Sequence, residues 1–199
     1  MIDLNKLNPE QKQAVLTTEG PLLILAGAGS GKTRVLTYRA AYLLEKGVPP
    51  WAILAITFTN KAAREMRERI NRLAGEAADD MWVMTFHALS ARILRRDIEK
   101  LGYKREFSIY DDDDQMTLIK RILKKLDISD KSYPPRAVKS VISDAKNHML
   151  SPEEWLKDNP DFRSKPYYRA YCEYEKELKE NNALDFDDLL VRTLELFAD

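Results

Sequence analysis

The chain has 199 residues, of which 44% are apolar and 32% charged, and its 32 lysines and arginines balance 32 aspartates and glutamates. This length allows one or two domains with a hydrophobic core. It contains no run of 18 apolar residues and no apolar signal sequence at its start, so we expect a cytoplasmic protein with no membrane partner. A single cysteine, Cys172, excludes an intramolecular disulfide and a cysteine-based zinc site.

The neutral net charge hides an uneven distribution. Residues 1–100 contain 15 basic and 11 acidic side chains, whereas residues 101–199 contain 17 and 21. The basic excess is concentrated in residues 61–72 and 92–96. Because ligands respond to local patches, zero net charge does not argue against a polyanionic partner. The alternative for any one of these side chains is a solvated helix face.

In the first half of the chain, predicted strands and helices alternate. A short helix is expected over residues 8–18, with Asn8 as its N-cap and Pro9 in its first turn. Continuous apolar runs predict strands, and 3.6-residue periodicity predicts helices between them. The strands are expected at 22–26, 52–57 and 81–86, and the helices at 32–46, 61–73 and 87–101. This alternation is typical of a parallel α/β sheet.

The second half has a different pattern, with one short strand expected at 107–110. Helices are expected at 113–126, 135–147, 152–157, 166–181 and 186–197. Ser151 and Glu154 form the capping-box pattern around Pro152. The run Asp111–Asp114 is interpreted as the acidic start of the next helix rather than a metal site. These residues therefore predict an all-helical subdomain.

Residues 26–33, Ala-Gly-Ala-Gly-Ser-Gly-Lys-Thr, lie between a predicted strand and a predicted helix. This is the setting of a P-loop, in which backbone N–H groups surround phosphate oxygens, the lysine reaches the β- and γ-phosphates and the hydroxyl binds Mg²⁺. A dinucleotide motif fails because Lys32 stands where its third glycine belongs. A glycine-rich turn without a ligand is the alternative. We expect ATP and Mg²⁺ as cofactors, Lys32 and Thr33 as catalytic residues, and nucleotide contacts from Ala26, Gly27, Ala28, Gly29, Ser30, Gly31, Lys32 and Thr33.

Several segments together resemble a known family. Residues 26–33, with alanine in the first place of the loop, resemble motif I of superfamily 1 DNA helicases. Residues 7–15 resemble their Q motif, 56–63 motif Ia, 85–89 motif Ib, and 184–190 the segment that returns from the helical insert. Five segments in this order are similar to the UvrD/Rep/PcrA group of superfamily 1A.

The resemblance implies a P-loop NTPase of the RecA-like type, with a parallel sheet, helices and an inserted helical subdomain. The implied domains are 1–100 for the first part of motor domain 1A, 101–183 for helical domain 1B, and 184–199 for a return toward 1A that stops before Walker B. No Asp-Glu pair occurs in the chain, and the segment before Asp185, Asp187 and Asp188 is too polar for a Walker B strand. We therefore expect the N-terminal portion of a longer enzyme, inactive alone.

The resemblance also implies roles for individual residues. Gln11 would read the adenine edge and Arg34 would approach the nucleotide, with plain surface positions as the alternative for both. Phe58 would stack on a base, with a core position as its alternative. His148 and Cys172 are interpreted as structural. The implied single-stranded DNA contacts are Thr57, Phe58, Thr59, Asn60, Lys61, Thr85, Phe86 and His87.

The function that the resemblance implies is that of an ATP-dependent DNA helicase. The full-length enzyme would translocate on single-stranded DNA from 3′ to 5′, unwind duplex DNA and work with repair or replication proteins. Two other classes remain open from the residues alone. One is another P-loop ATPase, such as a small kinase, and the other is a non-catalytic module that binds nucleotide or DNA.

Overall fold

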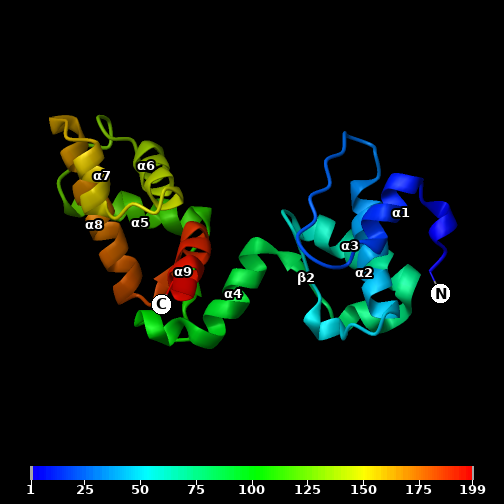
Figure 1. Ribbon diagram of the computed structural model, residues 1–199. Helices are drawn as coiled ribbons and strands as arrows, with labels where there is room; N and C mark the ends of the chain where they lie inside the picture. The colour runs from blue at the N-terminus through cyan, green and yellow to red at the C-terminus, as the bar shows by residue number, and fades with distance from the viewer. Residues whose placement is uncertain (1, 199) are drawn as a thin grey trace. The chain divides into compact units, whose positions relative to one another are not determined.

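The computed structural model describes residues 2–198, apart from the side chains of residues 76–78. It divides into two compact units, Met1–Phe86 and His87–Asp199, and the division falls near the start of helix α4 (Phe86–Asp97). No helix among the described residues is both long enough and apolar enough to cross a lipid bilayer. Figure 1 labels the main elements of both units.

The described residues of the first unit form three α-helices and two strands before α4. Asn8 caps α1 through a bond from the Gln11 backbone N–H, and the Gln11 side chain returns a bond to Asn8, so the expected cap is confirmed. The side chain of Thr59 caps α3 (Asn60–Ala74) by accepting from the Ala62 N–H. In chain order the elements are 3₁₀-helix η1 (Leu4–Lys6), α1 (Pro9–Leu16), α2 (Lys32–Glu45), η2 (Pro50–Ala52), β1 (Leu54–Thr57), α3 (Asn60–Ala74), η3 (Gly75–Asp80) and β2 (Trp82–Thr85).

Strands β1 and β2 form a small parallel sheet, in which Leu54 lies opposite Trp82 and Thr57 opposite Thr85. Helices α2 and α3 pack around a core shared with the strands, whose buried members are Ala40, Ala41, Ile53, Met66, Ile70, Met81 and Val83. Two of the three predicted strands are thus confirmed. Because the strands are parallel and in register, both enter their helices from the same edge of the sheet.

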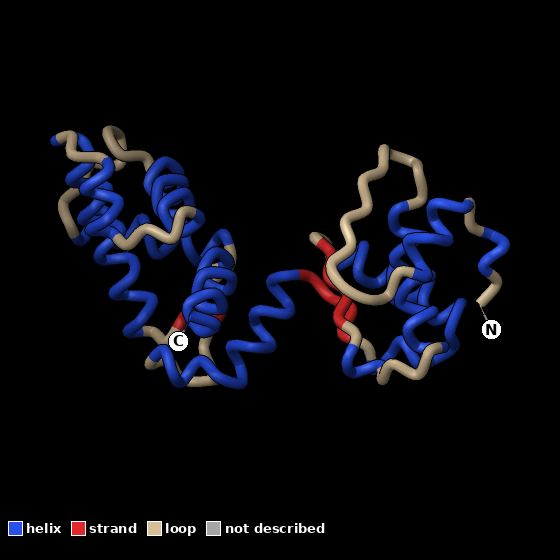
Figure 2. Tube along the Cα trace, viewed as in Figure 1, coloured by secondary structure: helices blue, strands red, loops and turns tan. Residues whose placement is uncertain are grey.

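The predicted strand at 22–26 is wrong for this structure. These residues lie in the long irregular segment between α1 and α2, drawn tan in Figure 2. The side chains of Leu23 and Leu25 are 80% and 85% exposed. A buried strand needs hydrogen-bonding neighbours and cover on both faces. Within residues 2–198, β1 pairs only with β2, so the apolar run has no strand beside it.

The second unit is almost entirely helical, as expected. Its elements after α4 are η4 (Ile98–Leu101), β3 (Ser108–Ile109), α5 (Asp112–Lys125), α6 (Pro135–Asn147), α7 (Pro152–Asp158), η5 (Phe162–Ser164), α8 (Lys165–Glu180), β4 (Ala183–Leu184) and α9 (Phe186–Ala198). Capping boxes at Asp111 and Ser151 confirm both predicted helix starts. Strand β4, which we did not predict, pairs in parallel with β3. Its two residues are too few to give a periodic signal.

A buried ionic network fastens α9 to α6 and α8. The ammonium group of Lys146, on α6, is 3% exposed and lies 2.8 Å from Asp185 Oδ2, 2.9 Å from Asp188 Oδ1 and 2.7 Å from Glu175 Oε1. The hydroxyl of Tyr174 donates to Asp185 at 3.0 Å. These contacts join three helices through a single cation.

The network holds more negative than positive charge. Arg192 supplies the second cation and lies 2.8 Å from Glu175 and 3.6 Å from Asp188, so two cations face the carboxylates of Glu175, Asp185 and Asp188. Burial raises the pKa of Asp188 to about 7. The negative charges of Asp185 and Glu175 also raise this pKa, whereas the positive charges of Lys146 and Arg192 lower it. One proton therefore offsets the excess charge up to near neutral pH.

We predict that Lys146→Met strongly destabilises the helical unit, by about 3–5 kcal/mol, because it leaves buried carboxylates without their cation. Native-state hydrogen exchange of α6, α8 and α9 measures the loss. Lys176→Met is the matched control, since Lys176 forms an exposed pair with Glu180 on α8 and should change stability by less than about 1 kcal/mol. Equal protection in the two variants would contradict the structural role of Lys146.

We also predict that the stability of the second unit falls as pH rises from about 5 to about 8. Folding raises the pKa of Asp188, so between its unfolded and folded pKa values the folded chain binds more protons than the unfolded chain, and its stability decreases with pH. The slope approaches at most ~1.4 kcal/mol per pH unit for one proton. Asp188→Asn should reduce the slope of stability against pH, while Asp187→Asn should leave that slope unchanged. An unchanged slope in Asp188→Asn, in urea unfolding across this range, contradicts the assignment.

Candidate nucleotide and nucleic-acid site

The predicted P-loop, residues 26–33, leads directly into α2. Gly29 and Gly31 have φ values of 76° and 87°, a left-handed conformation that glycine adopts without strain. Gly31 is the N-cap of α2, and no side chain caps this helix end. The N–H groups of the first turn thus lack a side-chain acceptor, and the helix dipole favours negative charge there. An anion is a fitting partner for this helix start.

Lys32 folds back onto the loop that precedes it. Its ammonium group donates to the carbonyl oxygens of Ala26 and Gly27, each at 2.7 Å. The hydroxyl of Ser30 donates to the Gly27 carbonyl at 2.7 Å, which tightens the same turn. Thr33 follows Lys32 with its side chain exposed. The ammonium is therefore at the loop, held by neutral carbonyls that a charged phosphate oxygen would outcompete as hydrogen-bond acceptors.

Gln11 meets the P-loop from α1. Its amide nitrogen donates to the Ser30 carbonyl at 2.9 Å, while its amide oxygen accepts from the Asn8 backbone at 3.2 Å. A Cβ atom at Gly31 would lie 2.8 Å from the same amide nitrogen. The close approach of Gln11 therefore depends on glycine at position 31. The structure thus brings together two predicted segments through residues that are 19 positions apart in the chain.

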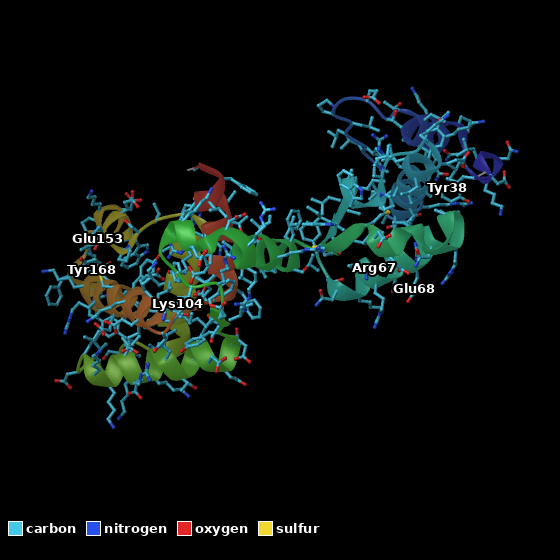
Figure 3. The ribbon with its side chains drawn as sticks, turned by 90° about the horizontal axis from the view of Figure 1, so that it is seen from below. Tyr38, Arg67, Glu68, Lys104, Glu153 and Tyr168 are labelled. Atoms are coloured by element: carbon cyan, nitrogen blue, oxygen red, sulfur yellow. The ribbon has the colours of Figure 1, made fainter. Side chains whose placement is uncertain are left out.

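Arg34 lies in the first turn of α2, and its side chain packs over its own helix. Its guanidinium carbon is 5.7 Å from the centre of the Tyr38 ring, which lies in the buried cluster between α1 and α2 (Figure 3). The side chain of Arg34 is exposed. The cation and ring form a surface contact that leaves the guanidinium in solvent.

An exposed aromatic pair stands at the carboxyl edge of the sheet. Phe58 follows β1, Phe86 follows β2, and their ring centroids are 5.7 Å apart. Phe58 is 89% exposed, so it is not a core residue of this unit. Thr57 and Thr85 pair across the strands just before the two rings, and Thr85 is buried. The parallel register thus brings the predicted Ia and Ib segments side by side.

The N-terminus of α3 adjoins this pair. Thr59 accepts from the Ala62 N–H at 3.1 Å, and Thr57 donates to the Thr59 carbonyl at 3.0 Å, which fixes the turn from strand to helix. Asn60 and Lys61 open the helix with exposed side chains. This corner therefore offers an aromatic surface, an ammonium group and a helix N-terminus to one ligand.

Arg67, from the basic segment 61–72, and His87, a predicted DNA contact, lie away from this corner in their side-chain contacts. Arg67, on α3, donates to the Val83 carbonyl of β2 at 2.9 Å and so ties the helix to the sheet (Figure 3). His87 belongs to the second unit, where its ring lies edge-on to Phe186 with centroids 6.1 Å apart. Arg67 therefore has a structural role, because it joins α3 to β2.

Two features of the structure could not be predicted from the sequence. Arg39 binds the end of α1, and its place among the apolar residues of the second half of α2 is the only local signal of this contact. Asp185 and Asp188 form reciprocal backbone bonds at the start of α9, at 2.8 and 3.2 Å, and both contact Lys146. Their Asp-x-x-Asp spacing is typical of a helix start. Their burial against Lys146, 39 residues before Asp185, gives no signal in the local sequence.

Comparison with known proteins agrees with this arrangement. The chain is 53% identical over 195 residues to the ATP-dependent DNA helicase PcrA of Bacillus subtilis (strain 168), and 52% identical to proteins of the same name from Staphylococcus aureus (strain Mu50) and Staphylococcus epidermidis. The alignments cover 98% of this chain but only 26–27% of the relatives, so the chain spans about a quarter of their length. Residues 7–199 match the UvrD/REP helicase N-terminal domain. The chain therefore belongs to the UvrD/REP helicase N-terminal domain family.

Proposed function

We propose that this chain forms the nucleotide-binding part, and one portion of the single-stranded DNA track, of an ATP-dependent DNA helicase. The observation that carries the proposal is the uncapped start of α2, with Lys32 and Gln11 both bonded to the loop before it. Residues 1–100 would form the first part of a RecA-like motor domain 1A, 101–183 the helical domain 1B, and 184–199 the return toward 1A.

ATP binding follows from the chemistry of the loop. The backbone N–H groups of residues 27–33 would surround the phosphates, and Lys32 would exchange its two carbonyl partners for phosphate oxygens. Thr33, exposed in the first turn, fits a ligand of Mg²⁺, which when bound would neutralise phosphate charge. Gln11 retains a second amide hydrogen and a second lone pair for the adenine edge. Arg34 would approach the nucleotide from the same turn.

DNA binding follows from the corner between β1, β2 and α3. The Phe58 and Phe86 rings would stack on bases, since stacking tolerates any base. Lys61, Asn60 and the start of α3 would hold a backbone phosphate. Thr57, Thr59 and Thr85 would complete the proposed track at the turns that follow the strands, and His87, the residue after Phe86, would add a further contact to the DNA.

Hydrolysis belongs to the longer enzyme in this proposal. The relatives carry the name ATP-dependent DNA helicase, and we extend that activity to the parent protein of this chain. It would move 3′ to 5′ on single-stranded DNA in the cytoplasm and unwind duplexes in repair or replication. None of the residues assigned above activates water, so the chain alone would bind nucleotide without turnover.

We predict that Lys32→Ala in the full-length protein lowers the DNA-stimulated ATPase rate by at least about 100-fold, because the developing charge on the phosphates loses its ammonium partner. Far-ultraviolet circular dichroism should remain unchanged, since Lys32 is exposed. Lys46→Ala, an exposed lysine just beyond the same helix, is the control. Near-normal DNA-stimulated turnover in Lys32→Ala would overturn the assignment, and ATPase activity without any response to single-stranded DNA would favour another P-loop ATPase.

We predict that Phe58→Ala weakens single-stranded DNA binding about 5- to 150-fold, the equivalent of about 1–3 kcal/mol for one lost stack. The dependence of affinity on salt should stay the same, because the ring contacts no phosphate charge. Lys61→Ala should instead reduce the slope of log affinity against log salt by about 1. Trp51→Ala, which removes an exposed aromatic elsewhere on the unit, is the control. Fluorescence anisotropy with an oligothymidylate distinguishes these outcomes, and equal affinity in Phe58→Ala and wild type contradicts the stacking role.

A further inference from the structure

Helix α1 is attached to the P-loop helix at both of its ends. At its start, Gln11 bonds the Ser30 carbonyl just before α2. At its end, Arg39 of α2 reaches back to α1, and its guanidinium donates to the Ala14 carbonyl at 2.8 Å. Between these contacts lies a small apolar cluster that includes Val15, Val35 and Tyr38. The position of Gln11 thus depends on how firmly the whole of α1 is held.

The contact made by Arg39 is stronger than one hydrogen bond. The same guanidinium also donates to the carbonyls of Thr17 and, at 3.5 Å, Thr18. The last carbonyls of a helix lack partners within the helix and form the negative end of its dipole. A cation at this end therefore donates hydrogen bonds to the carbonyls and also stabilises the negative end of the dipole. A planar guanidinium can serve several carbonyls at once, which an ammonium on a flexible stem does less well.

We propose that Arg39 is a positioning residue for recognition of the nucleotide base. By holding the end of α1, it fixes the amide of Gln11 beside the phosphate-binding loop, although Arg39 itself lies seven residues, or about 10 Å of helix, beyond Lys32. The inference rests on the proposed function, because it assigns to Gln11 the reading of adenine. It adds that base selectivity is set by the α1–α2 attachment as well as by Gln11.

The phosphates and the base therefore depend on different parts of the site. The phosphate contacts come from the loop and the first turn of α2, which Arg39 does not touch. Base contacts come from α1, which has no sheet to support it and is held by Arg39, Gln11 and the apolar cluster. Loss of Arg39 should consequently affect ligands that carry adenine and spare ligands that carry only phosphates.

The test uses the full-length protein with ATP as substrate and inorganic tripolyphosphate as competitor. Arg39→Met should raise KM for ATP about tenfold, leave kcat within about twofold, and leave the inhibition constant of tripolyphosphate unchanged. Gln11→Ala should give the same pattern, and the double variant should lose little more than either single one, because both act through one contact. Arg39→Lys should give an intermediate KM, and Lys46→Met should match wild type.

Several outcomes would overturn the proposal. If Arg39→Met weakens ATP and tripolyphosphate binding equally, Arg39 acts on phosphate binding. If the variant lowers kcat alone, Arg39 does not act on recognition of the base. Fully additive effects of Arg39→Met and Gln11→Ala would show that the two residues act independently. If Arg39→Met does not fold, Arg39→Lys decides, and failure of both variants to fold would make Arg39 a general structural residue. The proposed function fails separately, if wild type shows no preference for ATP over tripolyphosphate or if Lys32→Ala hydrolyses ATP normally.

Discussion

Helix α2 begins without a side-chain cap, and the rest of the first unit is arranged around that start. The glycine at its N-cap adopts a left-handed conformation, and no side chain caps the N–H groups of the first turn. The absence of a Cβ at Gly31 lets Gln11 approach the loop. Lys32 supplies positive charge to the same point and binds two loop carbonyls. A helix start that lacks an internal acceptor is stable enough to fold and remains able to take an anion.

Features set by neighbouring residues could be predicted from the sequence, and features set by distant ones could not. The caps at Asn8, Asp111 and Ser151 depend on residues three positions away, and all three are present. The run Leu22–Ala26 has the composition of a buried strand, but a strand also needs partners, and within residues 2–198 none lies beside it. Propensity describes what a segment can form, whereas pairing decides what it does form.

In the candidate site, too, features set by neighbouring residues could be predicted and features set by distant residues could not. The loop at 26–33 was visible in the sequence because the spacing of its residues defines it, whereas Phe58 and Phe86 stood out only through the resemblance to a helicase family. That Phe58 is exposed beside Phe86 follows from the parallel register of β1 and β2, which no local pattern encodes. Arg39 and Lys146 were invisible for a related reason, since their partners lie 25 and 39 residues away in the chain. In the acidic second half, Asp185 and Asp188 prove to be buried counterions rather than surface charge.

The two proposed ligand sites of the first unit share one core. Helix α2, which follows the proposed phosphate-binding loop, and helix α3, which opens the proposed DNA site, pack on the same buried side chains, among them Ala41, Met66 and Val83. Close-packed cores shift between discrete arrangements more readily than they deform continuously, so coupling between the sites requires an element with two states. The loop at 26–33 has the chemistry for this: Lys32 binds its carbonyls here, and a phosphate would take the ammonium away from them. Release of those carbonyls would free the loop backbone at the point where it enters α2, and α2 packs on the core that it shares with α3 and the two strands.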